Sequence, residues 1–164
     1  MLERYALLAT LGLLASCHAR EGDAIWPANA SQAVVADTGG GFAPQAPAGS
    51  SCRDAEAGTF TFTVADNKLR WRVCHAPGGA QPYAEVSGDR SLSADEARGL
   101  LDALRQVTRT KATGCGADKS VLTLRVTTPT GAHDYLDSFY VCHGSGVYVD
   151  GIDEVLGQAR RLAR

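Results

Sequence analysis

Two stretches of alternating hydrophobic and polar residues lie near the middle of the chain. Alternation with a period of two predicts half-buried β-strands over residues 59–64 and 68–73. Residues 65–67, Ala-Asp-Asn, are typical of the turn in a β-hairpin. A third strand is expected at 83–86. The hydrophobic positions that share a face are Phe60, Phe62, Val64, Leu69, Trp71 and Val73.

A helical pattern follows these strands and returns at the C-terminus. Hydrophobic residues recur at i, i+3, i+4, i+7 and i+10 from Ala97 and again from Ile152. This spacing places them on one face of an amphipathic helix. Ser93 and Glu96 match a capping box at the start of the first helix. Asp150 is placed to cap the second helix.

Between the two helices the strand pattern returns. Strands are expected over 121–128, over 133–141 with a bulge near 137–138, and at 147–149. The order is then strand, strand, strand, helix, given twice. We therefore expect an α+β fold, a two-layer sandwich with an antiparallel sheet and two helices on one face. It would be built from a duplicated βββα unit with half-repeats 51–110 and 115–164.

Residues 17–50 read differently from the rest of the chain. They are rich in Ala, Gly, Pro and Ser, and their hydrophobic residues are too sparse for a core. We expect a flexible tether here and a folded domain over 51–164. The alternative is that Ile25-Trp26 or Val34-Val35 docks on the domain as an edge strand.

Composition narrows the function classes. The chain has 164 residues and a formal net charge of −2, from 16 basic and 18 acidic residues. A non-specific nucleic-acid binder would carry a basic surplus, so no nucleic-acid partner is expected. No apolar run approaches the roughly 20 residues that a transmembrane helix needs.

The N-terminus carries a motif of its own. An apolar stretch over residues 5–15 has the length of a signal-peptide core and ends in Leu14-Ala15-Ser16-Cys17. This quartet resembles the lipobox of bacterial lipoproteins in all four positions. The resemblance implies that residues 1–16 are a signal peptide, that Cys17 carries diacylglycerol on its sulfur, and that its new amine is acylated, for example by palmitate.

The lipoprotein resemblance also bears on localisation. Residue 18, which follows the lipidated cysteine, is His and not Asp. By resemblance to the enterobacterial sorting rule, this favours the periplasmic side of the outer membrane over the inner membrane. The expected partners are the membrane, through the lipid, and an envelope protein or glycan.

Four cysteines remain after Cys17, and an exported setting allows disulfides. Three pairings of four cysteines exist. In a hairpin, the residue before the first strand lies beside the end of the second. The expected pairs are therefore Cys52 with Cys74, and Cys115 with Cys142.

A metal site is the alternative use of these residues. Cys74, His75, Cys142 and His143 include the ligand types that hold zinc. Adjacent residues of a strand point to opposite faces, however, so both members of each dipeptide can hardly reach one ion. We therefore expect no metal and no cofactor, and a metal-binding protein using His75 and His143 remains an alternative.

A catalytic site is only weakly indicated. His133 and Asp134, with Ser138 or Ser145, supply the residue types of a hydrolase triad, but no nucleophile-elbow motif is present. We expect no enzyme and no catalytic residue. A small periplasmic hydrolase using His133 is the alternative.

The sheet face away from the helices is the remaining candidate surface. By alternation it carries threonines and arginines, and Tyr83 or Tyr135 could join them. Arginine offers forked donors for carboxylate or phosphate. We therefore expect a non-catalytic binding or structural module, with a plain solvated face as the competing interpretation. The candidate binding residues are Thr61, Arg70, Arg72, Thr123 and Arg125.

Overall fold

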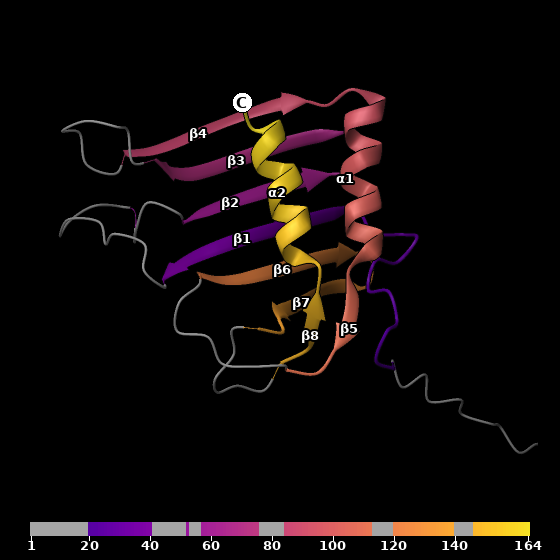
Figure 1. Ribbon diagram of the computed structural model, residues 1–164. Coiled ribbons are helices and arrows are strands. Elements are labelled where there is room, and N and C mark those ends of the chain that lie inside the picture. The colour runs from indigo at the N-terminus through magenta and orange to yellow at the C-terminus, as the bar shows by residue number, and fades with distance from the viewer. Residues whose placement is uncertain (1–19, 41–51, 53–56, 76–83, 113–119, 140–145) are drawn as a thin grey trace, which may run out of the picture.

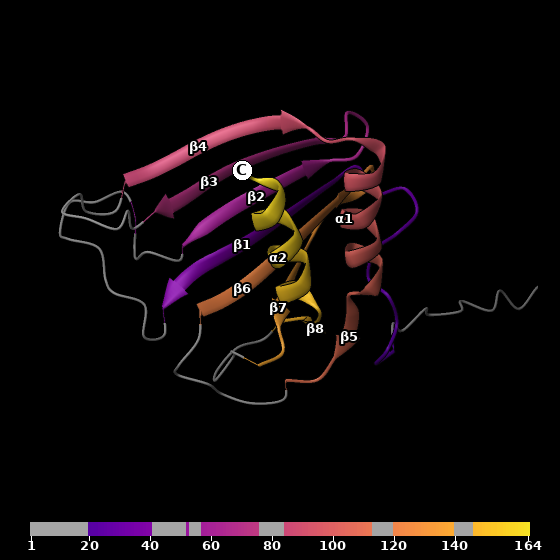
Figure 2. The same cartoon turned by 45° about the horizontal axis from the view of Figure 1, so that its top comes forward.

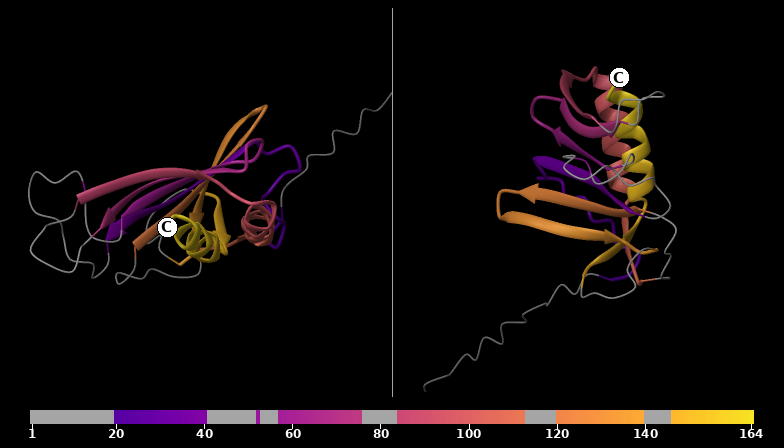
Figure 3. Two further views of the ribbon diagram at one scale, coloured as in Figure 1. Left: turned by 90° about the horizontal axis from the view of Figure 1, so that it is seen from above. Right: turned by 90° about the vertical axis from the view of Figure 1, so that its left-hand side faces the viewer.

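The protein is described by a computed structural model that covers residues 20–40, 52, 57–75, 84–112, 120–139 and 146–164. Eight strands form one sheet, and two helices cover one of its faces (Figures 1 and 3). The expected α+β class is confirmed. The elements are β1 (Gln32–Gly40), β2 (Gly58–Thr63), β3 (Lys68–His75), β4 (Ala84–Ser91), α1 (Ala94–Gln106), β5 (Thr108–Thr110), β6 (Ser120–Thr128), β7 (Gly131–Asp137), β8 (Tyr148–Asp150) and α2 (Ile152–Leu162).

The strands follow the order β4-β3-β2-β1-β6-β7-β8-β5 across the sheet. All neighbouring pairs are antiparallel except β7 and β8, which are parallel. The expectation of a wholly antiparallel sheet therefore needs this one correction. Strands β4 and β5 lie at the two edges, far apart in Figure 1.

The predicted tether is wrong for residues 20–40, which belong to the folded domain. Strand β1 is neither a tether nor an edge strand, because it pairs antiparallel with β2 on one side and with β6 on the other. Figure 2 shows it between the two hairpins. Residue Ile25 is buried in the core as well. The domain therefore begins well before residue 51.

The first hairpin and the first helix follow the sequence pattern closely. Strands β2 and β3 pair directly, and Asn67 in their turn adopts the left-handed conformation with φ 46°. Strand β4 continues to Ser91, five residues beyond the expected end. Ser93 caps α1, with its hydroxyl accepting from the Glu96 N–H and the Glu96 carboxylate accepting from the Ser93 N–H.

The second half departs from the expectation at two points. Strand β7 ends at Asp137 and gives way to a turn at the expected bulge; residues 140 and 141 lie outside the described part. Asp150 does not cap α2. The cap is Gly151, with φ 95° and no side-chain cap bond, while the Asp150 carboxylate accepts a short hydrogen bond from the Ser138 hydroxyl.

The order βββα does occur twice, but the pairing is not repeated. Strand β4 is antiparallel to β3, whereas β8 is parallel to β7. Strands β2 and β6 both run antiparallel to β1, and their hairpins extend away from it in opposite directions. The fold is therefore described as one sheet with two helices, without two equivalent units.

The core lies between the sheet and the helices. The positions predicted for the inner helix faces are buried, among them Leu100, Leu104 and Val155. They pack on the alternate residues of the strands, such as Phe60 and Leu124. Burial of this apolar surface at roughly 25 cal/mol per Å² is the main stabilising term.

An ion pair with a buried carboxylate joins the central strand to the last helix. Asp37 lies on the helix-facing side of β1, and its carboxylate accepts a 2.8 Å hydrogen bond from the Arg160 guanidinium of α2. The Gly39 N–H donates to the same carboxylate at 2.9 Å. The Asp37 side chain is only 3% exposed, so removal of its partner would leave a buried charge uncompensated.

Two glycines provide a matched test of the packing. A Cβ added to Gly99, in α1, would meet nothing within 4 Å, whereas one added to Gly88 would lie 2.4 Å from an indole carbon of Trp71. We expect Gly99→Ala to raise the free energy of unfolding by about 1 kcal/mol. Gly88→Ala should lower it by about 1–3 kcal/mol through overpacking.

Urea unfolding followed by circular dichroism measures both effects. A destabilised Gly99→Ala variant would contradict the placement of Gly99 on the outer side of α1. An unchanged Gly88→Ala variant would contradict the contact between β4 and the Trp71 ring.

Candidate binding face

The strand registers bring the predicted binding residues onto one face of the sheet. Residues directly opposite one another in an antiparallel pair share a face. One row of such pairs contains Asp89, Arg70, Thr61, Val34, Arg125 and Asp134. A neighbouring row contains Ser87, Arg72, Thr59, Ala36, Thr123 and Leu136. All five candidate residues therefore lie on this open face, opposite the helices.

The open face is hollowed over strands β2, β3 and β4. The hollow has a volume of ≈ 440 Å³ and is open to solvent. The side chains that line it are mostly polar or charged, and they come from three paired strands. Its lining residues are Thr59, Thr61, Arg70, Trp71, Arg72, Ser87, Gly88 and Asp89.

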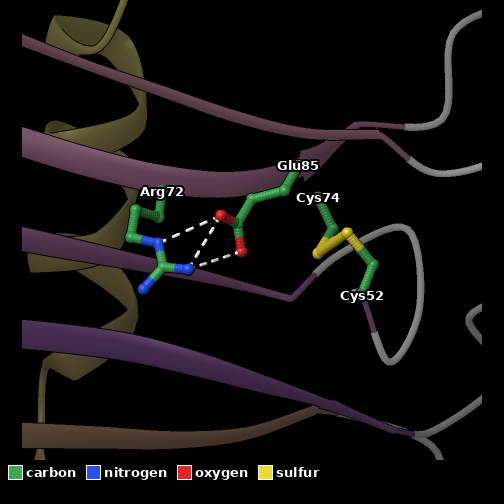
Figure 4. Close-up of polar contacts among 4 residues, drawn as sticks. All are labelled: Cys52, Arg72, Cys74 and Glu85. Carbon is green, nitrogen blue, oxygen red and sulfur yellow. Dashed lines mark hydrogen bonds and ion pairs between the residues drawn. A yellow bond between two sulfur atoms is a disulfide. The ribbon is translucent and has the colours of Figure 1, made fainter. Parts of the chain in front are cut away.

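Arg72 is held beside this hollow by a carboxylate of β4. Its Nε donates to Glu85 Oε1 at 3.1 Å, and its Nη2 donates to both carboxylate oxygens at 2.8 and 2.9 Å (Figure 4). The Arg72 side chain is nevertheless 69% exposed. Its forked donors thus remain at the surface, where a ligand can compete for them.

The first predicted disulfide lies next to this ion pair. Cys52 is bonded to Cys74, with 5.6 Å between their Cα atoms (Figure 4). Cys74 stands opposite Glu85 in the register, two residues beyond Arg72 on the same face of β3. The bond closes a separation of 22 residues, worth about 3 kcal/mol in the chain-entropy model. It fixes the end of the β2–β3 hairpin near the hollow.

Arg125 is engaged in the same way on the other side of β1. Its Nε and Nη2 donate to the two carboxylate oxygens of Asp134 at 2.6 and 3.0 Å. The hydrogen bond from Arg125, followed by its charge, lowers the pKa of Asp134, and the pair raises the pKa of Arg125. Asp134 is therefore a counter-ion of the open face.

Arg70 differs from the other two arginines. It stands opposite Asp89 in the register, but the Asp89 carboxylate forms its ion pair with Lys68, whose Nζ lies 2.5 Å away. The Lys68 hydrogen bond and charge lower the pKa of Asp89, and the Arg70 charge adds only the smallest contribution. Within the described part of the chain, Arg70 makes no hydrogen bond or ion pair through its side chain. It is an exposed guanidinium inside the hollow.

The residues of the weak hydrolase signal are not brought together. His133 and Asp134 are adjacent in β7 and point to opposite faces. Ser138 lies five residues beyond His133, or about 17 Å along an extended chain. The Ser138 hydroxyl is hydrogen-bonded to Asp150 instead. Ser145, the other candidate nucleophile, lies outside the described residues.

The alternative metal site lies only in part within the described residues. Cys74 is bonded to Cys52 and is not a free ligand. Cys115, Cys142 and His143 lie outside the described residues, so the second disulfide stays a prediction. In the described ranges, no group of three His, Cys, Asp or Glu side chains is placed to hold a metal ion.

Sequence reasoning missed the acidic members of the open face. Every second residue of β4 from 85 to 91 is polar, which places Glu85 and Asp89 on one side of a strand, and this alternation is the signal that could have found them. The prediction that Tyr135 could join the open face is wrong, because Tyr135 is buried opposite Leu124 on the helix side. Tyr83 lies outside the described residues.

Comparisons with known proteins assign no family. No protein-family model matches the chain, and no curated protein or solved structure matches it significantly. Neither of the two described helices is long and apolar enough to cross a membrane.

The Arg125–Asp134 pair makes a testable prediction about titration. Because Arg125 stabilises the carboxylate, Asp134 should titrate below its ordinary range, and Arg125→Gln should raise its pKa. A depressed carboxyl pKa stabilises the fold above the unfolded-state pKa, and this stabilisation is lost as the pH falls through the folded-state pKa. Carboxyl chemical shifts recorded between about pH 2 and pH 6 measure the shift.

The control for this titration is Arg105→Gln on the outer side of α1, where Arg105 pairs with Asp102. It should leave the Asp134 titration unchanged. An Asp134 pKa that is ordinary in the wild type, or that does not move in Arg125→Gln, would contradict the pairing.

Proposed function

We propose that the protein is a lipid-anchored module of the cell envelope that binds an anionic partner on the open face of its sheet and performs no chemistry on it. The observation that carries this proposal is Arg70, whose guanidinium has no hydrogen-bond or ion-pair partner among the described residues and lies in a polar hollow of ≈ 440 Å³. A ligand carboxylate or phosphate can accept two parallel hydrogen bonds from such a group.

The neighbouring side chains support an oxygen-rich ligand. Thr59, Thr61 and Ser87 surround Arg70 with hydroxyl groups that donate or accept hydrogen bonds. Acidic glycans and acidic segments of envelope proteins both offer carboxylates beside hydroxyl or amide groups. The extended backbone of three paired strands suits an extended partner.

The paired arginines can also take part in this binding. Arg72 and Arg125 are held by exposed ion pairs, with side-chain exposures of 69% and 57%. Exposed pairs of this kind contribute only about 0–1 kcal/mol. A ligand anion can therefore replace Glu85 or Asp134 at little cost, and Arg70 supplies the first contact.

The anchor rests on the sequence at residues 14–17. The lipobox quartet supports export and acylation at Cys17, and His18 supports the outer membrane over the inner one. Two or three acyl chains hold a protein on a membrane far more firmly than one. A disulfide between Cys52 and Cys74 is consistent with the oxidising periplasm.

We also propose that the two βββα stretches share a common ancestor, although they do not form equivalent units in the sheet. The matching order of strands and helices and the equal helix spacing support it. The different pairing of the third strands requires that the two arrangements have since diverged.

Arg70→Gln tests the proposed face. Hydrogen bonds to a charged group contribute about 1.5–3 kcal/mol, so the substitution should weaken binding by at least about 10-fold. The probe is isolated peptidoglycan, whose stem peptides carry carboxylates, and the readout is the protein fraction that sediments with it. The free energy of unfolding should not change, because Arg70 is exposed.

The matched control is Arg98→Gln, on the outer side of α1, which should bind as the wild type does. Equal binding by Arg70→Gln would contradict the assignment of the face. If the wild type sediments with neither peptidoglycan nor lipopolysaccharide, an acidic glycan is the wrong partner.

Cys17 makes a separate prediction about the anchor. The mature protein extracted from membranes should be heavier than residues 17–164 by a diacylglyceryl group and an amide-linked acyl chain. Cys17→Ser should incorporate no labelled palmitate, because the acceptor thiol is gone. Intact mass spectrometry measures both, and an unmodified wild-type mass would contradict the lipoprotein assignment.

A further inference from the structure

The part of the fold next to residue 17 is the edge of the sheet formed by β5. Residues 22–25 run along β5: the Gly22 N–H donates to the Arg109 carbonyl at 2.7 Å, and the Arg109 N–H donates to the Asp23 carbonyl at 2.9 Å. Ala24 forms an isolated bridge with Thr108. Residues 22–24 are therefore hydrogen-bonded to this edge, near the lower end of α1 in Figure 1.

This attachment leaves little chain between the fold and the proposed anchor. Cys17 and Arg20 are three residues apart, and consecutive Cα atoms are about 3.8 Å apart, so their Cα atoms lie within roughly 11 Å. That is close to the distance of about 8–10 Å over which surface charges act at ordinary salt. A lipid on Cys17 would therefore hold the β5 edge near the headgroups.

The surface at this edge is basic. A hollow of ≈ 290 Å³ is lined by Arg20, Arg109 and Lys111 together with Glu21. The exposed Asp23 carboxylate beside it accepts a hydrogen bond from the Arg20 backbone N–H, so three cations meet two anions and the net charge is positive. Glu21 forms an exposed ion pair with Lys111 at 3.1 Å, and the Lys111 side chain is 84% exposed. In the described part of the chain, the Arg20 and Arg109 side chains have no ion-pair partner. Tyr148, also in the lining, suits a wet boundary between headgroups and protein.

We propose that this basic surface is a docking site for anionic phospholipid headgroups of the membrane that holds the anchor. The proposal rests on the proposed function, because it requires the lipid on Cys17. Docking here fixes the orientation of the domain. Strands β5 and β4 lie at opposite edges of an eight-stranded sheet, and strands are about 4.8 Å apart. The Arg70 hollow is then held roughly 30 Å from the membrane.

Hydrogen exchange of the acylated protein tests the proposal. The full mature protein is placed in vesicles of phosphatidylethanolamine with phosphatidylglycerol, and in vesicles with phosphatidylcholine in place of phosphatidylglycerol. Amides of residues 20–24 and 108–112 should exchange more slowly in the anionic vesicles, and amides of 84–91 should not. High salt should remove the difference.

Charge removal makes the test specific. A basic residue near an anionic surface contributes about 1 kcal/mol, so each of Arg109→Gln and Lys111→Gln should lower the ratio of docked to undocked protein about 5-fold. The matched control is Arg98→Gln with Arg105→Gln on the outer side of α1, which should leave exchange unchanged.

The outcomes separate this inference from the proposed function. An acylated protein whose β5 edge exchanges equally in both kinds of vesicle overturns the docking site alone. Slower exchange at 84–91 in place of 108–112 also overturns it, because the opposite edge would then face the membrane. A mature mass without acyl chains overturns the anchor and the docking site together.

Discussion

The arrangement depends on β1, the strand that the hairpins on either side share. Residues 32–37 pair with β2 and, in the same span, with β6, so one short segment supplies both partners. Without it, β2 and β6 would each expose an unpaired edge. The strand is also tied to α2 through the buried Asp37 carboxylate and Arg160. The N-terminal segment thus joins the two halves of the sheet and attaches a helix over the joint.

The hairpin β2–β3 and the helix α1 could be predicted because their information is local. Strict alternation, a turn that tolerates a left-handed Asn67, and the Ser93 capping box each lie within a few residues. Strand β1 could not be recognised in this way. Its helix-facing positions include Ala33, Val35 and Asp37, and the acidic Asp37 interrupts the hydrophobic alternation. Asp37 is buried there because it pairs with Arg160 of α2, which is distant in the sequence. Strand β5 has only three residues, too few for a period to show.

The candidate face shows the same division between local and non-local information. Alternation was enough to put Arg70, Arg72 and Arg125 on one side of their strands. Their charge partners depend on which strands become neighbours and in what register. Glu85 and Asp134 are partners only because β4 follows β3 and β7 follows β6 across the sheet. For that reason Asp134 could be mistaken for a catalytic carboxylate beside His133.

The position of Lys68 explains why Arg70 has no ion-pair partner among the described residues, whereas Arg72 and Arg125 on the same face are paired. Arg70 and Asp89 stand directly opposite, yet the Lys68 ammonium reaches the Asp89 carboxylate at 2.5 Å. Two cations then share one anion, and the local charge is positive at the centre of the hollow. An anionic ligand relieves this excess, whereas a neutral ligand does not. The charge balance at the β5 edge, where Arg20, Arg109 and Lys111 meet Glu21 and Asp23, leaves a second positive region. Because that region lies at the sheet edge next to residue 17, we propose different partners for the two positive regions: the membrane at β5 and an anionic envelope component at the Arg70 hollow.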